Sequence, residues 1–466
     1  MSTLNAKRGL LVLCSVAFAA CTAAPVDESP SAGEEEATLR AAIDEYFDAR
    51  FDEGDTRALA ERLRASKVTL EQAEQWIRGA RASYEEEDPR EEVFELELTA
   101  DHVERDDGGA FSFPLYVYVP SSYTAEQATS LVFVGHGGNS AMTTSRAKEV
   151  AEMYIDDYKA GFGKNGGAIV VAPATTVGWL GVGNSILFST ISWASRRYHI
   201  DPDRIYCTGQ SMGGHLSFRA ALTYADRFGA FAPQSGGYDF TSADRGEIAG
   251  NLADPAGYAT YGTKGEPYGI DADNQILASY TQSKNYDWIF VGKPGGHEIF
   301  PDEHPKIMQF FQDHPRALYK PRVHYKTGGA MQFAQEKLDT WRHGYVAKPS
   351  TTLRSNTRYW IELSPRDDNG PLTIEGRVDS ASNRIELTSD GAEAIRVHLH
   401  PAMGLDLNKP IRVTINGQEA WSGVAETSLE HLLQTAHDRD DRGRIFYGAV
   451  DVRAQDSRPV PDPVLP

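Results

Sequence analysis

The chain has 466 residues and a formal net charge of −20 at pH 7, from 66 acidic and 46 basic side chains. This excess of negative charge argues against nucleic acid and anionic membrane surfaces as partners. With 41% hydrophobic residues, the chain can bury the core of one large domain and of a second, smaller one.

The N-terminal residues predict an exported protein. A basic start precedes an apolar run, Gly9–Ala20, that is too short for a comfortable transmembrane helix. The small residues before Cys21 resemble a bacterial lipobox, in which Cys21 would be lipidated, and ordinary secretory cleavage is the alternative. We expect a lipoprotein-type signal peptide over residues 1–20 and a flexible tether over 21–36. The protein would then lie in the periplasm, on the cell surface or outside the cell, and a lipid anchor would be its only contact with a membrane.

Cysteine usage excludes a disulfide framework. Cys14 and Cys21 belong to the signal region, so the mature chain keeps only Cys207. Cys207 lies on an apolar strand, where we expect a small buried hydrophobic residue.

Residues 37–92 have the spacing of short amphipathic helices. Leu39, Ile43 and Phe47 recur every four residues, and Thr69 with Gln72 has the form of a capping box. No chemical motif is present here, and we interpret the segment as a helical prefix that packs on the main domain.

From Val93 onward, apolar and polar residues alternate strictly instead of following the helical spacing. Residues 93–98 and 111–119 predict an antiparallel hairpin with a turn at 106–109. Further apolar strands alternate with helical stretches, which predicts a parallel sheet covered on both faces. These strands are Leu131–Val134, Ala168–Ala172, Arg204–Thr208, Phe228–Ala232, Tyr258–Tyr261 and Trp288–Val291.

The strand at Arg204–Thr208 leads into Gly209-Gln-Ser-Met-Gly213 and then into a helix. Gly-x-Ser-x-Gly between a strand and a helix is the nucleophile-elbow pattern, in which the serine adopts a strained backbone conformation. Side chains two residues to either side would clash, which explains the flanking glycines. The turn exposes the Ser211 hydroxyl and directs the Met212 N–H toward the atom under attack.

The opening hairpin, the parallel sheet and the elbow after the fifth strand resemble the α/β-hydrolase fold over residues 93–315. The segment from Asp201 to Gly214 resembles more narrowly the secreted esterases related to polyhydroxybutyrate depolymerases and to feruloyl and acetylxylan esterases. This resemblance implies an α/β-hydrolase catalytic domain over residues 93–318, with its catalytic residues in the order Ser, acid, His.

The resemblance also implies an oxyanion loop at His136-Gly-Gly138, in which Gly138 or Gly137 supplies one N–H donor and Met212 the other. His136 would orient this loop rather than act as a base. His297 follows a Gly-Gly pair after the last strand and matches the family's general base. The later histidines are interpreted as surface residues: His304, His314 and His324.

Three acids are candidates to orient His297, because the family's usual aspartate position holds Gly265 or Glu266. Glu266 is the first choice, since a glutamate can stabilise the imidazolium from a shifted loop. Asp271 and Asp273 are the alternatives.

Trp179 and Gln210 are candidate substrate-binding residues, and a plain packing role for Trp179 is an equally open alternative. No metal or cofactor is expected. The pairs His297-Glu298 and Glu303-His304 lack the second histidine of a zinc motif, and no dinucleotide-binding loop is complete.

Beyond residue 318 the sequence changes to short alternating strands separated by turns such as Asn416-Gly417, which predicts a β-sandwich over residues 319–455. A helix is expected at Ser428–Thr435, and residues 456–466 are expected to form a disordered tail. Similar β-sandwiches accompany secreted esterases, so carbohydrate or polymer binding and a structural capping role are both open.

Together these features predict an α/β protein, an α/β-hydrolase with a small helical prefix and a C-terminal all-β domain. The expected activity is that of a monomeric serine carboxylic-ester hydrolase that forms an acyl-enzyme on a small-molecule or polymer ester. A prolyl-oligopeptidase-like serine peptidase and a non-catalytic, surface-anchored binding protein are the alternatives.

Overall fold

The computed structural model describes residues 32–49, 56–81, 83–84, 88–105, 107–138, 142–176, 178–179, 182–238, 248–327, 345–347, 355–364, 372–392 and 394–453. The expected signal peptide, the lipidated Cys21 and the C-terminal tail lie outside the described residues and stay predictions. Within the described ranges, no helix is both long and apolar enough to cross a bilayer.

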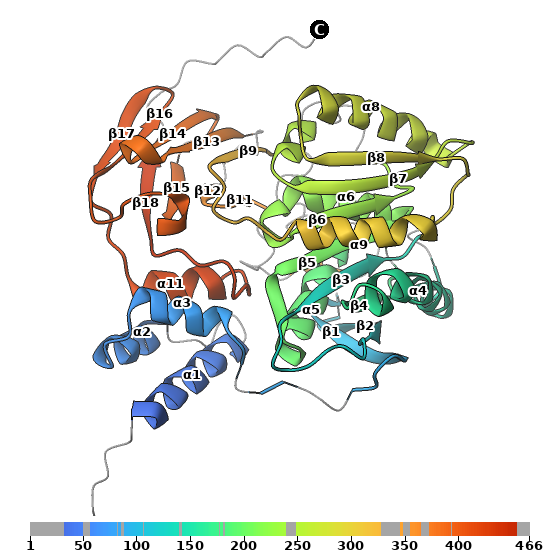
Figure 1. Ribbon diagram of the computed structural model, residues 1–466, viewed down its shortest axis with the longest axis horizontal. Helices are drawn as coiled ribbons and strands as arrows, with labels where there is room; N and C mark the ends of the chain where they lie inside the picture. The colour runs from blue at the N-terminus through green and yellow to red at the C-terminus, as the bar shows by residue number, and fades with distance from the viewer. Residues whose placement is uncertain are drawn as a thin grey trace, which may run out of the picture.

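A nine-stranded sheet forms the centre of the catalytic domain, in the order β10-β1-β2-β4-β3-β5-β6-β7-β8. Figure 1 labels its strands β1 to β8. β1 and β2 form the expected antiparallel hairpin, and β3 to β8 run parallel to one another. This order, with a nucleophile elbow after β5, is that of the α/β-hydrolase fold. The strands are β1 (Val93–Arg105), β2 (Ala110–Tyr118), β3 (Thr129–Gly135), β4 (Ile169–Pro173), β5 (Ile200–Gln210), β6 (Ala230–Gln234), β7 (Ala256–Gly262), β8 (Trp288–Lys293) and β10 (Tyr345–Ala347).

Helices cover both faces of this sheet, as continuous apolar strands require. On β3, Leu131 and Phe133 join the buried cluster beneath α5, α6 and α8. Val132 and Val134, which alternate with them, join the cluster beneath α4 and α9. The helices are α4 (Thr144–Tyr158), α5 (Val182–Arg197), α6 (Met212–Thr223), α8 (Ile270–Ser283) and α9 (His304–Asp313).

The apolar faces of the N-terminal helices pack on the C-terminal domain, not on the main domain as expected, and the contacts of the prefix with the main domain include the ion pair of Arg78 with Asp203. Leu39, Leu63 and Ile77 belong to the same buried cluster as the C-terminal strands. α2 (Thr56–Ala65) and α3 (Leu70–Arg78) contact α11 (Leu429–His437), as Figure 1 shows. α1 (Ala32–Asp48) begins inside the segment expected to be a tether, with two glutamates in its first turn that favour a helix N-terminus. The capping box predicted at the start of α3 is confirmed.

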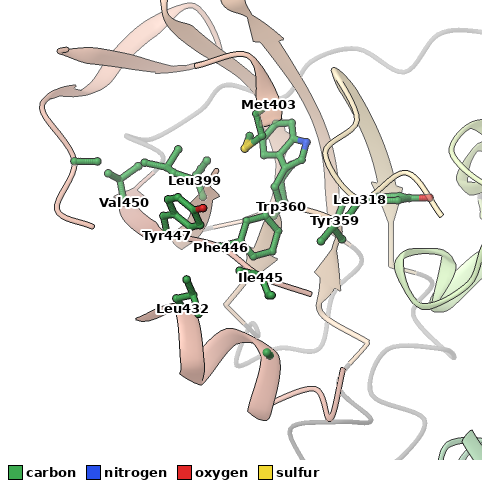
Figure 2. Close-up of a cluster of buried hydrophobic side chains, with 14 of the residues drawn as sticks. Leu318, Tyr359, Trp360, Leu399, Met403, Leu432, Ile445, Phe446, Tyr447 and Val450 are labelled. Atoms are coloured by element: carbon green, nitrogen blue, oxygen red, sulfur yellow. The ribbon is translucent and has the colours of Figure 1, made fainter. Parts of the chain in front are cut away.

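Two sheets form the C-terminal domain, β11-β12-β15-β18 and β17-β16-β14-β13-β9. Their paired strands are antiparallel except for β14 and β16. Trp360, Leu399, Met403 and Phe446 are part of its buried core (Figure 2). The strands are β9 (Arg322–Lys326), β11 (Thr357–Arg358), β12 (Ile361–Leu363), β13 (Thr373–Asp379), β14 (Arg384–Asp390), β15 (Ala394–Leu399), β16 (Ile411–Ile415), β17 (Gln418–Gly423) and β18 (Gly448–Arg453).

One strand crosses the expected domain boundary. β10 lies within the range assigned to the β-sandwich, yet it pairs with β1 at the edge of the nine-stranded sheet, with Val103 opposite Ala347. Three residues are too few to show an alternating pattern, so the sequence carries no signal for this pairing.

A buried arginine joins the C-terminal domain to the catalytic domain. Arg358 of β11 is fully buried, and its Nε lies 3.1 Å from Asp254 Oδ2. Its terminal nitrogens donate to the backbone carbonyls of Ala221, Leu222 and Asn251. These partners matter because a charge removed from water is stable only when it is paired and hydrogen-bonded.

Arg358→Met is expected to lower the free energy of unfolding by about 3–5 kcal/mol, because it leaves the Asp254 carboxylate buried without its counter-ion. Urea denaturation of both proteins measures the difference. Arg396→Met is the matched control, since its exposed ion pair with Asp451 is expected to contribute only about 0–1 kcal/mol. Equal losses in the two variants would contradict this account of the interface.

Candidate active site

Ser211 occupies the predicted elbow between β5 and α6. Its backbone has φ 57° and ψ −117°, which is strained for a residue with a side chain. A Cβ atom added to Gly209 or to Gly213 would overlap with the carbonyl oxygen of Gly135 on β3. Only glycine permits this close backbone approach, which is why the turn needs both glycines.

Gly213→Ala is expected to displace the elbow and to abolish labelling of Ser211 by a fluorophosphonate. Overpacking against Gly135 should also lower the free energy of unfolding by about 1–3 kcal/mol. Gly33→Ala is the control, because a Cβ at that helical position meets no atom within 4 Å. Undiminished labelling of the Gly213 variant would show that the turn tolerates a side chain.

His297 connects the serine to an acid. Its Nε2 lies 2.7 Å from Ser211 Oγ, and its Nδ1 lies 2.5 Å from Glu266 Oε2. Glu266 follows β7 and His297 follows β8, so the ends of neighbouring strands bring them together. Both ring nitrogens are engaged, and neither alternative acid, Asp271 or Asp273 in the first turn of α8, occupies one of them. The structure therefore unites Ser211 and His297 with the first-choice acid.

The Glu266 carboxylate is buried and held by several donors. Burial alone would raise its pKa, but hydrogen bonds from His297 and from the Gly262 N–H at 2.8 Å, together with the Ser235 hydroxyl nearby, hold the pKa below its usual value. The group is therefore ionised at neutral pH and can stabilise a positive charge on His297.

Ser235 is a residue of this site that no sequence motif marks. It directly follows β6, has a positive φ of 41° and is fully buried. Its hydroxyl donates to the Glu298 carbonyl at 3.0 Å, beside His297, and also interacts with the Glu266 carboxylate. Ser235 therefore links the loop of the acid to the loop of the histidine. The only trace in the sequence is Ser-Gly-Gly after an apolar strand, a pattern shared by ordinary turns.

Ser235→Ala is expected to raise the pKa of the Glu266 carboxyl group. The hydroxyl helps to hold the pKa of Glu266 down, so removing it raises that pKa. Glu266 is ionised above its pKa, and its support of His297 is lost as the pH falls through that value. The carbon-13 NMR shift of the Glu266 carboxyl carbon, followed from about pH 2 to about pH 7, reports this pKa directly. Ser389→Ala, at a buried serine of β14, should leave this pKa unchanged, and an unchanged pKa in the Ser235 variant would disprove the link.

The loop after β3 lies beside the elbow, because Gly135 pairs with Gly209 in the parallel register. His136 in this loop is fully buried, and burial lowers its pKa to about 4. Its Nδ1 donates to the Gly137 carbonyl at 2.7 Å, and its Nε2 accepts from the Thr175 N–H at 3.0 Å. The neutral imidazole thus orients the loop and has no free nitrogen to act as a base.

The two candidate substrate residues brace this loop instead of facing a substrate. Trp179 is 2% exposed and its Nε1 donates to the His136 carbonyl at 2.9 Å, which favours the packing alternative. Gln210 is 6% exposed and accepts from the Tyr154 hydroxyl. Tyr154 in turn receives a hydrogen bond from the Gly137 backbone, while burial raises its pKa to about 12. Trp179 and Gln210 therefore support the loop after β3 and do not make the expected contact with a substrate.

His304 is buried, so its interpretation as a surface residue is wrong. It is 1% exposed and stacks on Tyr158 with ring centroids 4.5 Å apart. The spacing of His304, Ile307, Met308 and Phe311 places all four on the inward face of α9. His314 and His324 are partly exposed and pair with Asp287 and Glu375.

Comparisons with known proteins give one family match and several distant structural likenesses. Residues 187–286, which contain the elbow and Glu266, match the prolyl oligopeptidase family. Similar solved structures include a thermostable esterase, with 17% identity and a TM-score of 0.35 over 47% of this chain and 60% of that chain. S-formylglutathione hydrolase FrmB from Staphylococcus aureus has 15% identity and a TM-score of 0.34, over 48% and 98%. Acetyl xylan esterase from Aspergillus awamori has 16% identity and a TM-score of 0.34, over 43% and 94%.

Comparison with curated protein sequences gives no match. The strand order, the elbow and the family match nevertheless agree on a serine hydrolase of the α/β-hydrolase fold. Ester and peptide substrates are both compatible with that chemistry.

Proposed function

We propose that this protein is a carboxylic-ester hydrolase that acts through Ser211, His297 and Glu266. The observation that carries the proposal is the continuous hydrogen-bond chain from Ser211 Oγ through His297 to Glu266. An ionised carboxylate only accepts hydrogen bonds, so His297 Nδ1 carries the ring proton. Nε2 is then unprotonated and positioned to accept the proton of the Ser211 hydroxyl.

The reaction proceeds in two acyl transfers. Ser211 Oγ attacks the acyl carbonyl carbon while His297 Nε2 takes its proton. The bond from the acyl carbon to the alcohol oxygen then breaks, and His297 returns the proton to the departing alcohol. A water molecule, deprotonated by the same nitrogen, attacks the acyl-serine and releases the acid. Glu266 stabilises the imidazolium that forms in each half-reaction.

Two backbone N–H groups stabilise the oxyanion of the tetrahedral intermediate. Met212 supplies one of them, at the N-terminus of α6, where the helix dipole adds to the effect. Gly138 is a better second donor than Gly137, since the Gly137 backbone is already bonded to Tyr154. Gly138 is also exposed at the end of its loop, where a substrate can reach it.

Esters are the favoured substrate class because the segment from Asp201 to Gly214 resembles secreted esterases. An alcohol leaves an acyl group more readily than an amine does, so the triad needs no additional subsite for an ester. A serine peptidase is the second candidate, supported by the match of residues 187–286 to the prolyl oligopeptidase family. The inactive binding-protein alternative has less support, because Glu266 contacts His297.

Rapid mixing with p-nitrophenyl acetate is expected to give a burst of about one p-nitrophenol per chain, followed by slower turnover. Ser211→Ala should abolish the burst and lower kcat by about 10⁴–10⁶-fold. Ser279→Ala, at an exposed serine of α8, is the matched control and should retain both the burst and the parent value of kcat. A burst that survives in the Ser211 variant would refute the assignment. Faster cleavage of a peptide p-nitroanilide than of the ester, in a parallel assay, would favour the peptidase instead.

A further inference from the structure

A cavity lies at the junction of three segments, and no residue of the proposed triad lines it. Phe47 of α1, Ile191 of α5 and Arg442, which follows α11, each contribute to its wall. Its volume is about 50 Å³. At about 10–15 Å³ per water molecule, this space suits about four waters or one organic molecule of similar size.

Arginine side chains dominate the polar lining of this cavity. Around it, six arginines share five aspartates as ion-pair partners, which leaves an excess of one positive charge among these described pairs. The arginines are Arg78, Arg81, Arg196, Arg227, Arg316 and Arg442, and the aspartates are Asp44, Asp48, Asp203, Asp440 and Asp441. A single negative charge would restore the balance.

Two of these arginines, each ion-paired through another nitrogen, hold buried N–H groups without a hydrogen bond in the described part of the chain, and the Asp48 carboxylate lies 3.9 Å from Arg196 Nε. These groups are Nε of Arg196 and both Nε and Nη1 of Arg442. Buried donors are nearly always satisfied in folded proteins, and leaving a charged donor unpaired is costly. An acceptor that comes from outside the chain would satisfy them.

Beside its polar lining, which also includes Asp440, Asp441 and two serines of α5, the cavity has an apolar wall. This wall consists of aliphatic, aromatic and proline side chains from α1, α5 and β5: Phe47, Phe188, Ile191, Ile200, Pro202 and Ile205. An inorganic anion would satisfy the arginines but leave this wall without a partner. A molecule with one anionic end and one apolar end matches both parts.

We propose that the junction cavity binds a small monocarboxylate with a short aliphatic chain. The two carboxylate oxygens accept hydrogen bonds from Arg442 and Arg196, whose planar guanidinium groups suit such an acceptor. The aliphatic chain lies against Ile191 and its apolar neighbours. Because the cavity is shared by three segments, the ligand stabilises their association by binding the assembled form alone.

Equilibrium dialysis of radiolabelled propionate against the full chain tests this site. Ser211 is first blocked with a fluorophosphonate, so that an acid bound at the triad is not counted, and chloride holds the ionic strength constant. The expected result is one saturable propionate per chain. In Arg442→Gln the affinity should fall by about tenfold or more, because a charge-assisted hydrogen bond is lost. The difference in propionate affinity between Arg442→Gln and the parent reports binding at the junction cavity even if Ser211 does not react with the fluorophosphonate.

Ser195→Leu is the second variant, because Ser195 lines the cavity from α5 and a leucine would fill it without altering any charge. Propionate binding should be lost in this variant while ester hydrolysis is retained, and this result decides the question if Arg442→Gln fails to fold. Arg412→Gln, at an exposed arginine of β16, is the control and should bind as the parent does. Absence of saturable binding, unchanged binding in both cavity variants, or equally tight binding of chloride would overturn the proposal.

Discussion

The close approach of β3 to the elbow is the constraint on which the candidate active site depends. The Gly135 carbonyl occupies the space that a side chain at Gly209 or Gly213 would need. Because β3 and β5 lie this close, Ser211 is held in a conformation that a free chain would avoid, and the oxyanion loop starts directly beside it. One steric contact therefore sets both the position of Ser211 and the start of the proposed oxyanion loop. The packed layers on the two faces of the sheet supply the stability that offsets this local strain.

The histidine and the acid are positioned by a different kind of force. His297 and Glu266 lie on loops, and hydrogen bonds rather than backbone overlap determine their geometry. The Glu266 carboxylate is buried, so it stays charged only because His297 and Gly262 donate to it and the Ser235 hydroxyl interacts with it. Loss of any one of these interactions raises the pKa of the carboxyl group, because the charged form loses a stabilising partner. The two halves of the site therefore respond differently to mutation: steric changes displace the serine, whereas changes at Ser235 alter the charge state of the acid.

The sequence predicts those parts of the fold that are encoded by neighbouring residues. The hairpin, the apolar strands, the elbow and the capping box at Thr69 all depend on spacing within a few residues, and the structure has each of them. The sequence leaves three acids as candidates to orient His297, because only the folded loop shows which acid reaches it. Features that depend on distant partners carry no such local signal. An amphipathic helix shows that it has an apolar face but not which surface covers that face, so the partner of α1 to α3 could not be inferred. His304 is a similar case, since its polarity suggested exposure whereas its place on the inward face of α9 buries it.

Buried guanidinium groups, rather than a shared apolar core, join the C-terminal domain to the catalytic domain. The apolar clusters of the two domains are distinct, and the C-terminal cluster includes little of the catalytic domain beyond Ala225 and Leu318. Arg358 and Arg316 instead reach Asp254 and Asp441 across the boundary. An apolar surface tolerates sliding, but a planar guanidinium satisfies its partners in one register only. This interface therefore fixes the orientation of the C-terminal domain, and it does so without adding much to the stability of the protein. A domain held in one orientation also keeps the arginine-rich junction beside α5 in place, so the same buried charges that align the domains create the conditions for a bound anion.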